Sequence, residues 1–253
     1  MNDIRPESKV NILGTEVTPI SKARLHQAIV GYIQAQNRAL ILNVNVHCLN
    51  LCYEQPRLQE FMNSAAINFC DGYGVKLGAW LLGVEIGERI TYADWMWDLA
   101  ELASNGNFAL YFLGGKPGIA EIAGRKLQET FPELKISGTH HGYFDKDVPD
   151  VNDEIINQIN AAQPDILIVG FGMPLQEYWL QDNWQRLNAI VGLTGGAAFD
   201  YVAGEVARAP SWMTNNGLEW LGRLILEPSR LFRRYVVGNP KFLLRILRQR
   251  IMK

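Results

Sequence analysis

The residues best suited to chemistry follow two short apolar runs of the chain. Residues 39–42 are followed by Asn43 and Asn45, and residues 66–70 are followed by Asp71. Such runs are typical of buried strands, and ligands of open α/β sheets bind outside the carboxyl ends of the strands. If the two runs are neighbouring parallel strands, these side chains converge on one crevice, where the carboxylate could act as a general base. A turn role for Asn43 and a helix N-cap role for Asp71 fit the same pattern.

Three further apolar runs end in glycine-bearing turns. The turns contain Gly114 and Gly115, then Gly170 and Gly172, and finally Gly195-Gly196. A strand, a glycine-rich turn and a helix in succession can hold a phosphate against backbone N–H groups and a helix N-terminus. The turns match neither the dinucleotide fingerprint nor the Walker loop. A bound nucleotide would explain three such turns, although tight connections in an α/β protein would also produce them.

The order of the elements predicts the fold class. Apolar runs alternate with helical segments, which indicates an α/β protein with a Rossmann-like, mostly parallel sheet flanked by helices. Residues 9–18 alternate about a glycine and predict a small N-terminal β-hairpin. Beyond residue 205 the segments are amphipathic and basic, which predicts a C-terminal helical appendage. We therefore expect a core over residues 1–205 and an appendage over residues 206–253.

Charge is distributed unevenly along the chain. The formal net charge is −2, yet from residue 221 onward only Glu227 opposes a series of lysine and arginine residues. A basic segment of this kind favours contact with an anionic surface. An in-plane membrane helix and a helix packed on the core with a basic outer face both have this composition. Nucleic acid is not an expected partner, because no nucleic-acid-binding motif accompanies the basic residues.

The cysteines and the ends of the chain indicate the compartment. Three cysteines make no disulfide framework and suit a reducing environment. Cys48 and Cys52, with His47 nearby, do not have zinc-ligand spacing, so we expect buried thiols and no metal site. The sequence contains neither the apolar segment of a signal peptide nor a run long enough to span a bilayer. We therefore expect a cytoplasmic protein that contacts the membrane surface.

A series of short motifs, taken in order, identifies a family. The motifs are Asn43-x-Asn45, Asp71-Gly72-x-Gly74, Glu88-Arg89, Leu113-Gly114-Gly115, Gly142-Tyr143-Phe144, Gly170-x-Gly172-x-Pro174-x-Gln176-Glu177, Phe199-Asp200, Arg208-Ala209-Pro210, Leu218-Glu219-Trp220, Arg223-Leu224, Glu227-Pro228 and Arg230. In this order and spacing, from about residue 8 to about residue 235, the chain resembles the WecG/TagA/CpsF glycosyltransferases. Well-known members carry threonine before Pro-Asn where this chain has Asn43-Val44-Asn45, so the resemblance does not indicate which sugar is transferred.

The resemblance implies an activity and a set of residues. It implies inverting, metal-independent transfer from a UDP-sugar to a polyprenyl-diphosphate-linked sugar in surface polysaccharide or cell-wall polymer synthesis, with no cofactor beyond that donor. It also implies that the core is catalytic, and that the appendage touches the inner face of the cell membrane and completes the active site. Asp71 would be the general base, with Asn43 and Asn45 in the catalytic set. Nucleotide-sugar binding would fall to Arg89, Gly114, Gly115, Tyr143, Gly172, Gln176, Glu177 and Asp200, and binding of the acceptor diphosphate to Arg223, Arg230 and Arg233.

Several of these residues also have a purely structural interpretation. Arg89 could form a salt bridge with Glu85 or Glu88 instead of meeting the charge of the leaving UDP. Tyr143 could stack on uracil or close the core. Glu177 lies in the first turn of a helix, where a carboxylate also serves capping.

Two other functions share parts of this pattern. A non-catalytic, membrane-associated protein that binds nucleotide sugars would have the same crevice and the same basic appendage. A Rossmann-type NAD-dependent dehydrogenase would have the same sheet, but it needs a dinucleotide fingerprint that Gly114-Gly115 does not supply. An apolar surface on an unpaired appendage could also drive self-association into a homo-oligomer. The donor sugar, the acceptor sugar and the linkage do not follow from the sequence.

Overall fold

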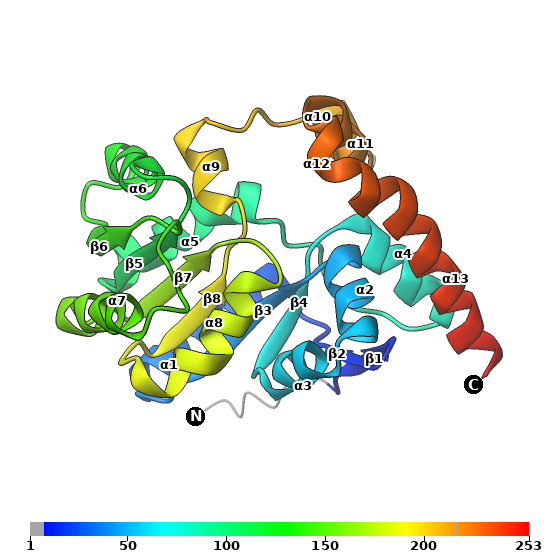
Figure 1. The fold of residues 1–253 in the computed structure, drawn as a ribbon, viewed down its shortest axis with the longest axis horizontal. Helices are drawn as coiled ribbons and strands as arrows, with labels where there is room; N and C mark the ends of the chain where they lie inside the picture. Colours follow the sequence, from blue (N-terminus) through cyan, green and yellow to red (C-terminus); the bar gives the residue numbers. More distant parts are fainter. Residues whose placement is uncertain (1–7, 216, 253) are drawn as a thin grey trace. The chain divides into compact units, whose positions relative to one another are not determined.

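A six-stranded sheet and a separate hairpin form the β-structure. The computed structural model describes residues 8–215 and 217–252. The large sheet has the strand order β4-β3-β8-β7-β5-β6 (Figure 1). Pairing is parallel between β3 and β8, β8 and β7, β7 and β5, and β5 and β6. The strands are β3 (Ala39–Val44), β4 (Ile67–Cys70), β5 (Ala109–Gly114), β6 (Lys135–His140), β7 (Ile166–Gly170) and β8 (Val191–Thr194). The predicted α/β fold is confirmed.

Helices connect the strands and make up the C-terminal segment. Those before β8 are α1 (Lys22–Gln34), α2 (Val46–Glu54), α3 (Pro56–Ser64), α4 (Tyr73–Leu82), α5 (Tyr92–Gly106), α6 (Ile119–Thr130), α7 (Pro149–Ala162), α8 (Leu175–Asn183) and the 3₁₀ turn η1 (Trp184–Arg186). Those after β8 are α9 (Ala198–Ala203), α10 (Ser211–Asn215), α11 (Glu219–Leu226), α12 (Pro228–Phe232), the π-helical turn η2 (Arg233–Val237) and α13 (Gly238–Ile251). The predicted C-terminal helical appendage is therefore present.

The chain divides into two compact units, each described below by itself. Unit 1 comprises residues 1–21, 43–91 and 206–253, and unit 2 comprises residues 22–42 and 92–205. One break between the units, after residue 205, coincides with the boundary expected from the sequence. The division into a catalytic core and an appendage remains a prediction about function.

In unit 2 the strands β5, β7 and β8 are buried except at Ala109, which explains their almost continuous apolar sequence. Phe112 of β5 stacks on Phe199 of α9, with ring centroids 4.9 Å apart. In the parallel register Gly114 lies opposite Gly170, and Val169 lies opposite Thr194. The turns that follow β5, β7 and β8 therefore begin side by side at one edge of the sheet.

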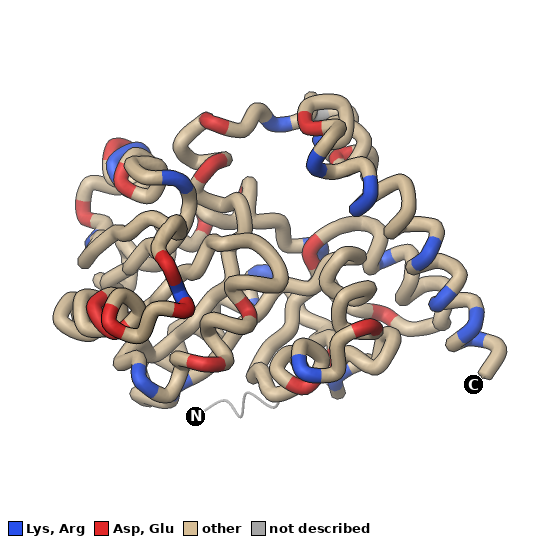
Figure 2. Tube along the Cα trace, in the orientation of Figure 1, with Lys and Arg blue, Asp and Glu red and all other residues tan. Residues whose placement is uncertain are grey.

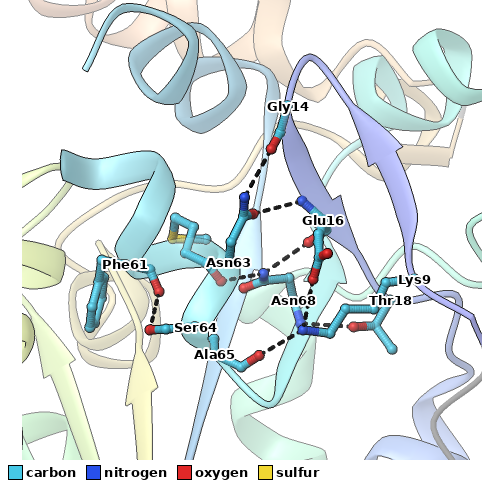
Figure 3. Close-up of polar contacts among 10 residues, drawn as sticks. Lys9, Gly14, Glu16, Thr18, Phe61, Asn63, Ser64, Ala65 and Asn68 are labelled. Atoms are coloured by element: carbon cyan, nitrogen blue, oxygen red, sulfur yellow. Dashed lines mark hydrogen bonds and ion pairs between the residues drawn. The ribbon is translucent and has the colours of Figure 1, made fainter. Parts of the chain in front are cut away.

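In unit 1 a hairpin of β1 (Val10–Ile12) and β2 (Thr15–Val17) is tied to α3 and β4 by two asparagines (Figure 3). Asn63 donates from Nδ2 to the carbonyl of Gly14 and accepts from the N–H of Glu16, both at 2.9 Å. The fully buried Asn68 donates from Nδ2 to the carbonyl of Glu16 at 2.8 Å. These bonds confirm the predicted hairpin and hold β4, whose carboxyl end carries Asp71.

The last helix, α13, packs against α2 and α4 of the same unit. Phe242 and Ile246 are buried, and a Cβ added to Gly78 of α4 would lie 2.5 Å from the ring of Phe242. Arg245 donates to Asn50 Oδ1 at 2.9 Å. Figure 2 shows predominantly basic residues along this part of the chain. The helix is thus docked on its unit while it presents a basic surface.

Candidate active site

A carboxylate and an amide meet at the ends of β3 and β4. The N–H of Asp71 donates to the carbonyl of Val44 at 2.7 Å, and Asn43 donates from Nδ2 to Asp71 Oδ2 at 2.9 Å. Asn43 lies within β3 and is buried, so the turn interpretation is wrong. The N-cap of α4 is Gly72, so the capping interpretation of Asp71 is wrong too. The sequence-based expectation that Asn43 and Asp71 meet is confirmed.

The surroundings of Asp71 favour a carboxyl group that accepts a proton readily. Burial raises the pKa of Asp71, and the negative charge of Glu219 raises it further. The hydrogen bond from Asn43 and the guanidinium groups of Arg234 and Arg223 oppose this shift without cancelling it. A base whose pKa lies closer to the working pH transfers protons more effectively. The geometry and the charge around Asp71 therefore suit general-base catalysis.

Asn45 has a local structural role. It is the N-cap of α2, and its Oδ1 accepts a hydrogen bond from the N–H of Cys48 at 3.0 Å. This bond satisfies one of the free amide groups at the start of the helix. A catalytic role for Asn45 remains a prediction.

Arg89 forms an ion pair that the sequence did not suggest. Its Nη1 lies 3.1 Å from Glu219 Oε2, and both side chains are largely buried. The guanidinium also lies over the ring of Tyr73, at 4.6 Å from the centroid. Arg89 therefore holds the first turn of α11, the helix that carries Arg223.

The appendage arginines differ in their surroundings. Arg230 is exposed and pairs with Glu227, and Arg233 is exposed. Arg223 is half-buried. Arg234, which the sequence analysis did not select, has a buried Nε with no hydrogen-bond partner among the described residues. Its charge also lowers the pKa of Asp71, so it belongs to the surroundings of the carboxylate.

His47 is neutral near pH 7. Burial and, to a smaller extent, the charge of Arg234 lower the pKa of His47 to about 4. A neutral imidazole adds no positive charge to the surroundings of Asp71. The arginines are therefore the cations that act on this carboxylate.

In unit 2 the backbones of the glycine turns bind one another. Gly114 has a φ of +153°, and a Cβ there would lie 2.4 Å from the carbonyl oxygen of Gly170. The N–H of Gly115 donates to that carbonyl at 3.2 Å, and the N–H of Gly142 donates to the carbonyl of Gly115 at 2.8 Å. Glycine is required here because the backbones approach so closely. The amide of Gly115 is already used within the protein.

Gln176 and Glu177 form a buried pair beside two of these turns. Gln176 Oε1 accepts from the N–H of Gly172 at 3.1 Å and from that of Gly196 at 3.0 Å. Gln176 Nε2 donates to Glu177 Oε1 at 2.7 Å. The N-cap of α8 is Pro174, and the carboxyl of Glu177 accepts a hydrogen bond from its own N–H in the first turn of the helix. Burial raises the pKa of Glu177 to about 7.

The other predicted nucleotide contacts lie in loops of unit 2. Tyr143 is 70% exposed, so it does not close the core, and stacking on a base remains a prediction. Its loop is held by Lys146, whose Nζ donates to the carbonyl of Gly142 at 2.6 Å and lies over the rings of Phe144 and Phe171. Asp200 is half-buried in the first turn of α9.

The described residues contain no candidate metal site, no disulfide and no helix that could span a membrane. No group of three His, Cys, Asp or Glu side chains in residues 8–215 and 217–252 is arranged to hold a metal ion. Cys48, Cys52 and Cys70 form no disulfide and are buried, and the burial of Cys48 and Cys52 agrees with the expectation from the sequence. None of the described helices combines the length and the apolar character needed to cross a membrane.

Comparison with known proteins identifies the family. The model of the glycosyl transferase WecG/TagA/CpsF family matches residues 10–253. The chain belongs to this family. It is similar to the N-acetylglucosaminyldiphosphoundecaprenol N-acetyl-beta-D-mannosaminyltransferase of Bacillus subtilis (strain 168), with 29% identity over 86% of this chain and 82% of the relative. A protein with the same printed name from Staphylococcus aureus (strain NCTC 8325 / PS 47) is 25% identical over 89% of this chain and 88% of its own length.

Membership in the WecG/TagA/CpsF family confirms the resemblance and makes the protein a glycosyltransferase. It disfavours the dehydrogenase and the non-catalytic alternatives. Sequence reasoning about this glycosyltransferase missed Arg234 and Glu219. In the pair Arg233-Arg234 the helical phase leaves Arg233 exposed and Arg234 half-buried, and the sequence pattern did not distinguish the two.

Proposed function

We propose that this glycosyltransferase transfers a sugar from a UDP-sugar to a polyprenyl-diphosphate-linked sugar, with inversion and without a metal ion. The observation that carries the proposal is Asp71, a half-buried carboxylate that accepts a hydrogen bond from Asn43 and lies near the charges of Arg223 and Arg234. The relatives from Bacillus subtilis and Staphylococcus aureus are named for transfer to a diphosphoundecaprenol-linked sugar, which supports an acceptor of this class. The product would enter a surface polysaccharide or cell-wall polymer.

The proposed step uses Asp71 as a general base. Asp71 takes the proton of the acceptor hydroxyl while that oxygen forms a bond to the anomeric carbon of the donor. The bond between the anomeric carbon and UDP breaks, and UDP leaves with the electron pair. A single displacement of this kind inverts the anomeric configuration. General-base catalysis of this type contributes roughly 10²–10⁴-fold to the rate.

Arginines are proposed to meet the negative charge in place of a metal ion. Arg223 and Arg230 of the predicted set, together with the half-buried Arg234, supply guanidinium groups that pair well with phosphate oxygens. The hydrogen-bonding capacity of Arg234 Nε is unused by the described residues, which supports an anionic ligand there. Arg89 supports this group because it anchors α11 through Glu219.

The glycine turns of unit 2 are proposed to bind the nucleotide. Gly114, Gly115 and Gly172 lie at the carboxyl ends of parallel strands, where α/β sheets bind ligands. The exposed ring of Tyr143 can stack on uracil. Asp200, at the start of α9, is proposed as a hydrogen-bond acceptor for the nucleoside.

We also propose that the protein is cytoplasmic and binds the inner face of the membrane through unit 1. Large apolar side chains are exposed on α4 and the C-terminal helices, with Trp80 at 72%. On α13 the exposed Leu244, Leu247 and Ile251 accompany arginines. Apolar side chains and basic residues together favour binding at an anionic lipid surface.

A transfer assay tests the proposal. A panel of UDP-sugars is incubated with a polyprenyl-diphosphate-sugar analogue in EDTA, using wild type, Asp71→Asn and the exposed control Asp150→Asn. We expect transfer by the wild type and the control and a loss of about 10²–10⁴-fold for Asp71→Asn. Full activity of Asp71→Asn would reject Asp71 as the base. Transfer that requires an added divalent ion would reject metal independence.

A further inference from the structure

One side-chain oxygen joins the loops that follow two neighbouring strands of unit 2. Gln176 Oε1 accepts hydrogen bonds from Gly172, in the β7–α8 loop, and from Gly196, in the β8–α9 loop, at 3.1 and 3.0 Å. The two strands pair directly, with Val169 opposite Thr194. The Gln176 amide therefore links the two loops beyond the point where the strand pairing and the bond from the Gly195 N–H to the Val169 carbonyl hold them.

Glu177 determines the orientation of that amide. Gln176 Nε2 donates to Glu177 Oε1 at 2.7 Å, while Oε1 of the same amide receives two N–H groups. A flipped amide would present its NH₂ to two donors and its oxygen to a carboxyl acceptor. The bonds on both sides therefore specify the same orientation.

The pair is buried and its bonds are directed inward. Gln176 is 0% exposed and Glu177 is 1% exposed. The carbonyl oxygen of Gln176 has two lone pairs, and the two glycine amides occupy both. Gln176 therefore has no remaining acceptor with which to recognise a nucleotide directly, which was the role expected from the family resemblance.

The helix that carries the pair is anchored by a second network. Trp179 donates from Nε1 to Asn152 Oδ1 at 2.7 Å, and Asn152 donates to Asn183 Oδ1 at 2.9 Å. Asn183 in turn donates to the carbonyl of Trp179 at 2.8 Å. These buried bonds fix α8 against α7, so the position of Gln176 is set by a rigid element.

We propose that Gln176 and Glu177 are positioning residues: Glu177 orients the Gln176 amide, whose oxygen holds the Gly172 and Gly196 loops in the arrangement that binds the nucleotide diphosphate. This inference rests on the proposed use of a UDP-sugar donor. Loss of the acceptor leaves two amide N–H groups without a partner, which is costly in a buried setting. The loops would then shift, and nucleotide affinity would fall without any lost contact between Gln176 and the ligand.

An exchange of the two side chains tests the proposal with UDP as the probe. Gln176→Glu keeps an acceptor for the glycines but places a second carboxyl oxygen against Glu177. Glu177→Gln keeps an acceptor for the Gln176 amide. In the double variant the carboxylate at 176 can accept from both glycines and from the new amide at 177. The pair Gln158 and Glu154, also hydrogen-bonded but exposed on α7, supplies the control Gln158→Glu.

We expect calorimetry to show a loss of UDP affinity of about tenfold or more for Gln176→Glu, equivalent to about 1.4 kcal/mol. The double variant should regain a UDP affinity within about threefold of wild type, and Gln158→Glu should stay within the same range. In spectra of ¹⁵N-glycine-labelled protein, the Gly172 and Gly196 amide signals should move in Gln176→Glu and return in the double variant, while Gly83 of unit 1 stays unchanged.

Two results would overturn the positioning role. One is a double variant that is folded but binds UDP no better than Gln176→Glu. The other is Gln176→Ala with wild-type affinity for UDP and unmoved Gly172 and Gly196 signals. A wild-type protein that binds no UDP would instead contradict the proposed donor, so the two failures are distinguishable.

Discussion

The carboxyl groups of Asp71 and Glu177 both have a raised pKa, yet their surroundings differ: Asp71 is half-buried and Glu177 is buried. Asp71 in unit 1 accepts a hydrogen bond from Asn43 and lies in the field of Arg223, Arg234 and Glu219. Glu177 in unit 2 is affected chiefly by burial and by its bond from Gln176. The charged neighbours of Asp71 suit a site for proton transfer and anion binding. No charged neighbour is among the causes of the Glu177 shift, which suits a carboxyl group that holds loops in place.

The largest expected effect is the pH dependence of the transfer rate, which shows whether Asp71 or Glu177 is the base. The transfer rate of the wild type should fall as pH drops through the pKa of Asp71, and this fall should begin above the ordinary aspartate value of 3.8, because burial raises that pKa. A pH–rate profile measured with saturating substrates checks this. Glu177→Gln should show the same fall in rate at low pH, which we call the acid limb of the profile. If the acid limb is missing in Glu177→Gln, Glu177 is the group that titrates.

A smaller effect is expected from the appendage arginines. Arg234→Met should raise the KM for the lipid-linked acceptor about tenfold to a hundredfold, because a charged hydrogen bond to a phosphate oxygen is lost. It should also move the acid limb to higher pH, because the Arg234 charge lowers the pKa of Asp71. Steady-state kinetics over a pH series measure both effects. Arg233→Met is the matched control. A larger increase in KM for Arg233→Met than for Arg234→Met would support Arg233, the residue predicted from the sequence, as the ligand of the acceptor diphosphate.

The pH dependence of stability should distinguish Glu177 from a neutral residue. The native pKa of Glu177 is about 7 against an unfolded value of 4.5, so between these pH values the native state binds the extra proton. The stability of the wild type relative to Glu177→Gln should therefore fall as pH rises from about 4.5 to about 7 and then level off. Thermal melts of both proteins across this range measure the difference. A difference in melting temperature between the two proteins that stays constant across this pH range would show that the pKa of Glu177 is not raised in the native state.

The smallest effect concerns the basic surface of α13. Arg248 is exposed, so Arg248→Gln should reduce binding to vesicles with anionic lipid about fivefold, in line with about 1 kcal/mol per basic residue near the surface. Binding to neutral vesicles should not change. Sedimentation with both vesicle types checks this, with Arg125→Gln on α6 of unit 2 as the control. An equal loss of vesicle binding in Arg248→Gln and Arg125→Gln would show that α13 is not part of the membrane-binding surface.

The sequence by itself determined the order of the elements, the parallel α/β class and the family. It also placed Asn43 and Asp71 at neighbouring strand ends, because buried parallel strands are almost purely apolar and the polar residue that ends each run is conspicuous. The glycine turns were visible for the same reason: a backbone approach as close as that of Gly114 to Gly170 excludes a side chain.

Only the tertiary structure decided what each polar side chain binds. Asn45 caps its own helix, Arg89 pairs with Glu219 from a segment 130 residues away, and Gln176 uses its oxygen on two glycine amides. The sequence likewise did not show that Arg234 has a buried Nε while Arg233 is exposed, because two adjacent arginines have the same chemistry and differ only in the direction in which the helix points them. The partners of long polar side chains depend on distances in the folded protein, and the spacing of residues in the sequence does not predict those distances.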